Sequence, residues 1–209
     1  MRNVIAIAVA AAVAGGLSVA AYAVPGAYVG VGGGYNWMDV NNNVSSGANI
    51  DTDQYNLNAE VGYLFPVFSQ FQLGPELGYN YYGNYQVNAT DNSTGGYKET
   101  FNAVDLMLVG EYDFTQQWFV QARAGAQYTM MSDSGSNVVI PSVGTLSKQS
   151  DDQTLAKAGL SVGYYFVPQF SAALTYDHLF GKDIDVDTST NDDIPTMDTV
   201  GISLTYHFV

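Results

Sequence analysis

The strongest constraint on the fold of this chain is an alternation of apolar and polar residues that recurs along its length. In the segment QYNLNAEVGY, the residues Tyr55, Leu57, Ala59, Val61 and Tyr63 alternate with polar residues and glycine. A period of two indicates a β-strand with one apolar and one polar face. The same alternation predicts eight strands, at 27–37, 54–65, 71–82, 100–114, 118–130, 154–166, 170–180 and 199–208.

The connections between these segments alternate in length. Short ones lie near 65–70, 113–117 and 167–169, and long polar ones at 38–53, 83–98, 132–152 and 181–197. Short turns at one end and long loops at the other are typical of transmembrane barrels, whose strands of about ten residues cross the bilayer at a tilt. The fold class predicted is therefore all-β, an eight-stranded antiparallel up-and-down transmembrane β-barrel. The rival is a soluble sandwich or lipocalin-like barrel, which would hide the apolar face inside.

The first residues have a different character. Arg2 precedes an apolar run, and the segment 1–23 ends in the small-residue pattern Ala21-Tyr22-Ala23. This pattern predicts a cleaved signal peptide over 1–23, with a membrane helix or anchor as the alternative, and a barrel domain over 24–209. Export together with a lipid-facing barrel predicts the outer membrane of a Gram-negative cell envelope.

The composition excludes several classes of protein. The chain has no Cys, which excludes disulfides and Cys-ligated metals. It has 6 Lys+Arg against 20 Asp+Glu, so no nucleic-acid partner is expected. Only 12% of residues are charged and 13% are aromatic, the opposite of a disordered chain. The polar face of the strands carries Gly, Asn and Gln rather than Lys, which favours membrane over water. No cofactor is expected.

Several aromatic-glycine segments resemble the OmpA-like transmembrane domain of the outer-membrane protein β-barrel family. They are VGYLFPVFSQFQLGPELGYNYYG at 61–83, WFVQARAGAQY at 118–128, VGYYFVPQFSAALTYDHLF at 162–180 and VGISLTYHF at 200–208. The resemblance implies an eight-stranded barrel among outer-membrane lipid and lipopolysaccharide. It also implies partnership with periplasmic chaperones and with the barrel assembly machinery, which reads a terminal aromatic; here Phe208 is penultimate.

The alternation of the strands predicts that seven charged residues on the polar face point into the lumen: Glu60, Glu76, Asp105, Glu111, Arg123, Lys157 and Asp177. In the resembling family, a Glu that matches Glu76 and an Arg that matches Arg123 lie in the lumen. The interior of an eight-stranded barrel is just wide enough for side chains to fill, and buried charges must pair. We expect a structural plug in which Glu76 pairs with Arg123 or Lys157; a gated ion pathway is the alternative.

The long loop 181–197 is acidic. Asp183, Asp185 and Asp187 alternate there and could offer oxygens to a weak divalent-cation site, although the EF-hand pattern fails and a solvated loop is the simpler interpretation. The four long loops, 38–53, 83–98, 132–152 and 181–197, are the candidate surface for an external ligand.

No enzyme is predicted. His178 follows Asp177, and neighbouring strand residues point to opposite faces, so the two cannot act as a dyad. His207 is predicted to face inward beside Ser203 and Thr205, away from any substrate groove. The function predicted is a monomeric outer-membrane barrel with a polar-filled lumen and a structural or surface-interaction role. A small passive, porin-like channel is the alternative, and a lipid-modifying enzyme the third reading.

Overall fold

The computed structural model describes residues 25–38, 40–41, 48–50, 53–89, 94–140, 144–146, 152–181, 184–185 and 194–208. Its eight long strands are β1 (Gly26–Met38), β4 (Asp53–Phe68), β5 (Phe71–Ala89), β6 (Thr94–Asp113), β7 (Trp118–Ile140), β9 (Asp152–Val167), β10 (Phe170–Phe180) and β12 (Met197–His207). The short strands are β2 (Val40–Asn41), β3 (Ala48–Ile50), β8 (Gly144–Leu146) and β11 (Ile184–Asp185). The predicted signal peptide, 1–23, lies outside the described residues.

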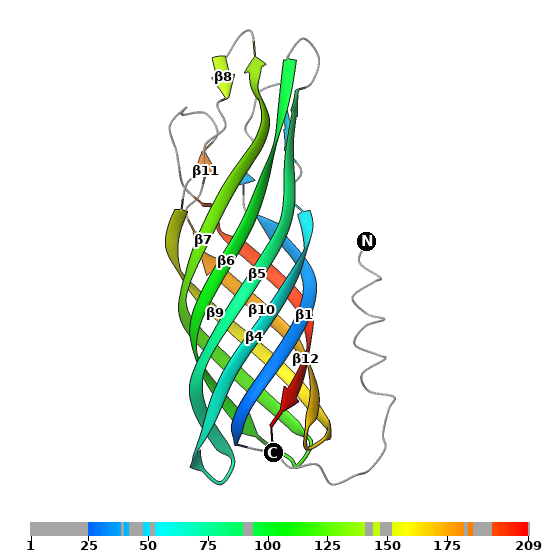
Figure 1. Cartoon of the computed structure of the whole chain (residues 1–209), viewed down its shortest axis with the longest axis vertical. Coiled ribbons are helices and arrows are strands. Elements are labelled where there is room, and N and C mark those ends of the chain that lie inside the picture. The colour runs from blue at the N-terminus through cyan, green and yellow to red at the C-terminus, as the bar shows by residue number, and fades with distance from the viewer. Residues whose placement is uncertain are drawn as a thin grey trace.

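The long strands form a closed antiparallel barrel (Figure 1). Each pairs with the next long strand in the chain, and β12 returns to pair with β1, with Gly32 opposite Ser203. The closure continues past β12, where the Phe208 amide donates to the Ala27 carbonyl at 2.9 Å. In lipid every backbone group needs an internal partner, and a closed ring supplies one for each strand edge. The predicted fold class is confirmed.

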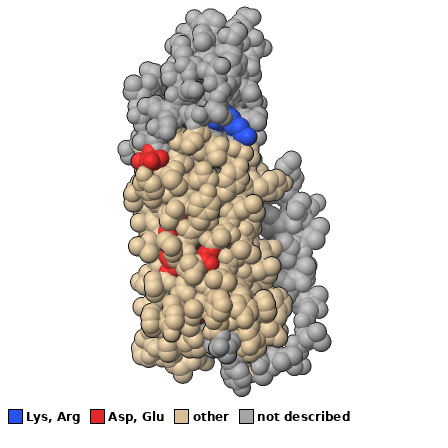
Figure 2. Space-filling model, in the orientation of Figure 1, with Lys and Arg blue, Asp and Glu red and all other residues tan. Residues whose placement is uncertain are grey.

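The apolar face of the strands is the outer face. Leu57, Leu106 and Ile202 are 64%, 63% and 49% exposed, whereas Glu111 and Gln127 are completely buried. In the view of Figure 2, most of the barrel surface carries no charged side chain, and Lys or Arg appears only near the end that bears the long connections. This is the reverse of a soluble barrel. Among the described residues there is no helix long and apolar enough to cross a membrane.

Exposed aromatic rings gather near both ends of the barrel wall. Near the short turns, the lower girdle consists of Tyr63, Phe65, Phe68, Tyr112, Phe114, Phe166, Phe170, Tyr206 and Phe208. Towards the other end, the upper girdle consists of Tyr35, Trp37, Tyr55, Tyr79, Tyr128, Tyr176 and Phe180. Such girdles mark the two membrane interfaces of outer-membrane barrels.

Glycines of β1 make room for polar side chains of β4. Gly30 lies opposite Glu60 in the strand register, and a Cβ built on Gly30 would come within 2.5 Å of the Glu60 carboxylate. In the same way, Gly32 lies opposite Asn58, whose amide would clash with any side chain there. The lumen side chains of β4 therefore lie across the glycines of the GVGGG segment at 30–34 of β1, where no side chain blocks them.

Part of what the sequence predicts as loop is strand. Strands β5, β6 and β7 continue beyond the barrel wall and project from it (Figure 1), so that 83–98 and 132–152 are largely extensions of the sheet. Two three-residue strands lie at the edges of this projecting sheet. Strand β3 pairs with the end of β5, and β8 pairs with the end of β7. The predicted loop 38–53 contains β2 and β3, and β2 pairs in parallel with β11 from the loop 181–197. Backbone pairing holds these segments without the apolar alternation that marks a lipid-facing strand.

Candidate functional site

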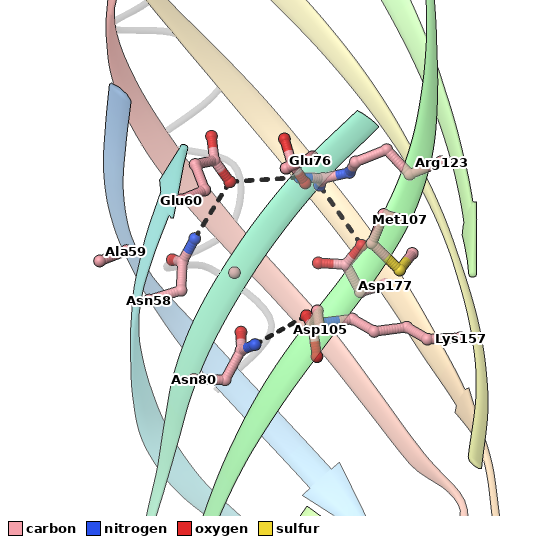
Figure 3. A pocket seen from close by; sticks show the side chains of 11 residues that line it. Asn58, Ala59, Glu60, Glu76, Asn80, Asp105, Met107, Arg123, Lys157 and Asp177 are labelled. Atoms are coloured by element: carbon pink, nitrogen blue, oxygen red, sulfur yellow. Dashed lines mark hydrogen bonds and ion pairs between the residues drawn. The ribbon is translucent and has the colours of Figure 1, made fainter. Parts of the chain in front are cut away.

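The middle of the lumen contains a cluster of charges centred on Arg123. This residue of β7 lies 3.5 Å from Glu60 on β4, 3.8 Å from Glu76 on β5 and 3.3 Å from Asp177 on β10. Its guanidinium also donates to the Ser161 hydroxyl at 3.3 Å. The Arg123 side chain therefore joins β7 to β4, β5, β9 and β10, and its carboxylate partners converge on it in Figure 3.

A separate ion pair, between Lys157 and Asp105, adjoins this cluster. Lys157 Nζ on β9 donates to Asp105 Oδ2 on β6 at 2.6 Å, and Asn80 donates to the same oxygen at 2.7 Å. The Tyr28 hydroxyl donates to Glu76 at 2.7 Å. Because charge-assisted hydrogen bonds are the stronger kind, this arrangement offsets part of the cost of burying the ions.

Glu111 lies apart from these six charges. Its carboxylate accepts hydrogen bonds from Gln121 at 2.7 Å, Tyr165 at 2.9 Å and Gln72 at 3.5 Å. No Lys or Arg of the described chain forms an ion pair with it. The structure therefore brings together six of the seven residues predicted as lumen charges. It places Glu111 among amides and a phenol, where the Gln72 amide also donates to the Asp113 carboxylate at 3.3 Å.

The six charges line a cavity of about 20 Å³, which we call the chamber. Its walls are formed by Asn58, Ala59, Glu60, Glu76, Gly78, Asn80, Asp105, Met107, Arg123, Lys157 and Asp177. A space of this size holds about one water molecule. The carboxylate oxygen Asp105 Oδ1 is buried beside it without a hydrogen-bond partner. The chamber is thus a polar layer with little free volume.

Rings fill the lumen on the side of the short turns. Phe119 lies 4.9 Å from Tyr165, Tyr165 lies 5.1 Å from His207, and His207 lies 5.9 Å from Tyr28, measured between ring centroids. These four side chains, the aromatic layer, are between 1% and 3% exposed. They lie between the chamber and the end of the barrel that bears the short turns.

Apolar side chains fill the lumen on the side of the long connections. This apolar cap consists of Tyr82, Phe101, Ala103, Leu179, Ile194 and Met197, with Met38, Met131 and Leu155 packed against it. Tyr82 joins the cap to the chamber, because its hydroxyl donates to Gln127 at 2.7 Å and lies 3.4 Å from Lys157 Nζ. The polar layer is consequently enclosed between an aromatic and an apolar layer.

Parity did not indicate either enclosing layer, because it predicts a lumen face that is polar throughout. Phe101, Met107 and Phe119 occupy lumen positions and are buried. The apolar runs LMLV at 106–109 and WFV at 118–120 are signals that could have revealed Met107 and Phe119, since an uninterrupted apolar run is consistent with a strand that is buried on both faces.

The two histidines lie in different environments. His207 faces the lumen as predicted, on the same face of β12 as Ser203 and Thr205, and its Nε2 lies 3.2 Å from Ser171 on β10. His178 lies on the outer face, away from the lumen side chain of Asp177, and its Nδ1 lies 2.7 Å from Asp198 on β12. Sequence reasoning missed the latter pair, because it depends on the register between β10 and β12.

Most of the acidic loop 181–197 lies outside the described residues. Asp183 and Asp187 lie outside the described residues, and Asp185 is described only as backbone in β11. Over the described ranges there is no group of three or more His, Cys, Asp or Glu residues that could hold a metal ion.

Comparison with solved structures agrees with the barrel. The outer membrane protein OprG from Pseudomonas aeruginosa is similar at 14% identity and a TM-score of 0.55, over 91% of this chain and 100% of that chain. Ail, the attachment invasion locus protein of Yersinia pestis, is similar at 12% identity and a TM-score of 0.49, over 88% and 100%. The outer membrane protease OmpT from Escherichia coli is similar at 10% identity and a TM-score of 0.43, over 88% and 97%. At 14% identity, the likeness to OprG shows the fold alone.

No curated protein matches the sequence. A family model described as the outer membrane protein beta-barrel domain matches residues 7–208, nearly the whole chain. With the closed eight-stranded ring and its lipid-facing apolar surface, this match places the protein in the bacterial outer membrane. The chain belongs to the outer membrane protein β-barrel domain family.

Proposed function

We propose that this protein is a monomeric structural barrel of the outer membrane with a lumen that does not conduct and a projecting sheet that contacts external ligands. The observation that carries the first part is the chamber, which has room for about one water molecule and lies between the aromatic layer and the apolar cap. A channel would need a continuous file of water instead.

The energetics of the chamber support a plug. An ion that crossed it would have to separate Arg123 from the carboxylates of Glu60, Glu76 and Asp177. Breaking a buried ion pair costs about 3–5 kcal/mol, because the remaining charge has lost its partner. The porin-like alternative would require several such steps in succession.

Planar-bilayer recording tests whether the lumen conducts ions. The refolded barrel, shown to be folded by its heat-modifiable migration on a gel, is expected to give no stepwise current. Clean steps that disappear in Glu76→Ala would show that the chamber conducts and would contradict the plug. The same gel assay on Glu76→Ala separates a closed lumen from an unfolded sample.

The projecting strands support the second part of the proposal, which is contact with external ligands. Strands β5, β6 and β7, bordered by β3 and β8, extend the sheet beyond the wall (Figure 1). Main-chain hydrogen bonds give this arm a defined shape, which suits contact with a ligand better than an unstructured loop. A variant in which short turns replace 85–97 and 133–151 is expected to fold but to lose binding to a panel of extracellular proteins and glycans.

We also propose that the protein is not an enzyme. Ser171 and His207 are the serine and histidine that meet in the lumen, and both are about 3% exposed beneath Tyr28 and Tyr165. The Ser171 side chain in this position is almost completely buried, which does not suit attack on a lipid. Incubation of the refolded barrel with lipopolysaccharide and phospholipid is expected to release no fatty acid.

A further inference from the structure

Two carboxylates lie close together at the end of the lumen that bears the short turns. Glu111 and Asp113 are two residues apart on β6, so they face the same side of the strand. One amide nitrogen, Nε2 of Gln72 on β5, donates to both, to Glu111 at 3.5 Å and to Asp113 at 3.3 Å. Among the described residues, neither carboxylate forms an ion pair with Lys, Arg or His. We call Gln72, Glu111 and Asp113 the turn-end site.

Two oxygen atoms of the turn-end site are buried without a hydrogen-bond donor in the part of the chain that the structure describes. They are Oε1 of Gln72, a residue that is 4% exposed, and Oδ1 of Asp113. Both atoms are acceptors, so neither can satisfy the other. Because buried polar atoms almost always have a partner, the two oxygens indicate a missing positive or hydrogen-donating group.

The turn-end site is held in place by neighbouring strands. In the strand register, Glu111 lies between Gln72 on β5 and Gln121 on β7. Its carboxylate accepts from Gln121 at 2.7 Å and from the Tyr165 hydroxyl on β9 at 2.9 Å. Three donors that converge on one carboxylate fix its position, so little further ordering is needed when a ligand binds.

The turn-end site is covered on one side and accessible on the other. Phe119 of the aromatic layer lies opposite Asp113 in the strand register and is 2% exposed. Asp113 is only half-buried and is the last residue of β6, where its backbone amide donates to the Gln70 carbonyl at 2.8 Å. A small ion can therefore enter from the short-turn end, which is the periplasmic end of such barrels.

The spacing of the oxygens suits Ca²⁺. The two ends of an amide have nearly the same shape, so the Gln72 amide can turn over and place Oε1 where Nε2 now bridges the carboxylates. The oxygens would then be separated by the present 3.5 and 3.3 Å. Neighbouring ligands at right angles on Ca²⁺ are about 3.4 Å apart, whereas on the smaller Mg²⁺ they are about 2.9 Å apart.

We propose that the turn-end site binds one Ca²⁺ ion. Its protein ligands are the carboxylates of Glu111 and Asp113 and the Oε1 atom of Gln72, and water from the periplasm completes the shell. The two carboxylates neutralise the charge of the ion. Glu111 keeps its bonds to Gln121 and Tyr165, because an ionised carboxylate offers about four acceptor positions. The bound ion ties the start of β5 to the end of β6.

A tryptophan close to the turn-end site provides the test. Trp118 precedes Phe119 on β7, and it is the sole tryptophan in Trp37→Phe. Tb³⁺ replaces Ca²⁺ in oxygen sites and emits when a nearby excited tryptophan transfers energy to it. The Trp37→Phe barrel, refolded in zwitterionic detergent at pH 8, is titrated with Tb³⁺. We expect saturable emission under tryptophan excitation that Ca²⁺ reverses, and that Mg²⁺ reverses only at concentrations about tenfold higher or more.

Variants in the Trp37→Phe background assign the ligands. Asp113→Asn is expected to raise the Kd for Tb³⁺ and for Ca²⁺ about tenfold or more, because it removes one of two charged ligands. Gln72→Met removes the Oε1 atom at similar length, and it is expected to weaken binding in the same direction. It also provides a second reading if Asp113→Asn does not fold. Asp152→Asn is the matched control, because Asp152 binds Tyr128 at the opposite end of the barrel, and its Kd is expected to stay within about twofold.

The same titrations can overturn the proposal. Absence of Tb³⁺ emission in the folded Trp37→Phe barrel, or an unchanged Kd in both Asp113→Asn and Gln72→Met, would remove the site. An equal loss in Asp152→Asn would indicate a general charge effect. In Trp118→Phe, the remaining Trp37 reports from the end that bears the acidic loop 181–197. Emission that Ca²⁺ reverses in that variant alone would place the ion at the loop instead.

Discussion

Arg123 and Asp177 form an ion pair at 3.3 Å although a complete strand lies between them. Gly159 of β9 lies opposite Arg123 on one side and opposite Asp177 on the other. The side chains of β7 and β10 meet over a position that has no side chain, and a Cβ built on Gly159 would clash with the Asp177 carboxylate.

The first prediction follows from this arrangement. Gly159→Ala should lower the free energy of unfolding by about 1–3 kcal/mol, the usual effect of overpacking. Urea unfolding of the barrel in liposomes measures it. Gly78→Ala is the matched control, since its Cβ would lie 3.5 Å from the nearest Asp105 atoms, an ordinary contact. Equal losses in both variants would contradict the role given to Gly159.

The Lys157–Asp105 pair gives a second prediction. Lys157→Met should cost about 3–5 kcal/mol, because it leaves the Asp105 carboxylate, 5% exposed, without a counter-ion. The double variant Lys157→Met/Asp105→Asn should recover much of this loss, since both charges are gone. Additive losses in the same unfolding assay would show that the two residues are energetically independent.

The third prediction concerns which residues of the barrel wall face the acyl chains. Leu204 is 57% exposed on the outer face, and Leu204→Arg should cost about 2–4 kcal/mol if it meets acyl chains. Val67, 47% exposed beside a short turn, should tolerate Arg at about 0–1 kcal/mol. Thr205→Arg should act differently from Leu204→Arg, by crowding the lumen. Similar losses at Leu204 and Val67 would argue against the assigned membrane depth.

The fourth prediction concerns the apolar cap. Phe101, 1% exposed, should cost about 3–5 kcal/mol when changed to Ala, because a cavity opens inside the lumen. Leu106→Ala on the lipid face should cost far less, because acyl chains fill the vacated space. Heat-modifiable migration gives the unfolding temperature of each variant. A smaller effect at Phe101 than at Leu106 would contradict an enclosed cap.

The wall of the barrel follows from its alternation of residues. The segment predicted at 170–180 coincides with β10, because Leu174 and Tyr176 face lipid while the residues between them face the lumen. The segment predicted at 118–130 stops ten residues short of the end of β7 at Ile140. Above the membrane neither face of the strand meets lipid, so no selection for alternation acts there.

The site was predictable only in part. Lumen charges are evident from the alternation of faces, since Arg123 and Lys157 interrupt the otherwise uncharged segments predicted at 118–130 and 154–166. Their partners depend on strand register, which has no signature in a single strand; thus His178 finds Asp198 only because β10 and β12 align those residues. The enclosing layers depend on shape, because a ring such as Phe119 occupies a lumen position by lying over Gly163.

The pairing of β1 with β12 has a consequence for biogenesis. Tyr28 and His207, opposite each other in this pairing, belong to the first and last strands of the wall, so synthesis must finish before the cylinder can be sealed. Until then a nascent sheet would present two unsatisfied margins to its surroundings, prone to sticking to other chains. Holding the polypeptide unfolded until its final strand emerges is therefore an inherent demand of this topology.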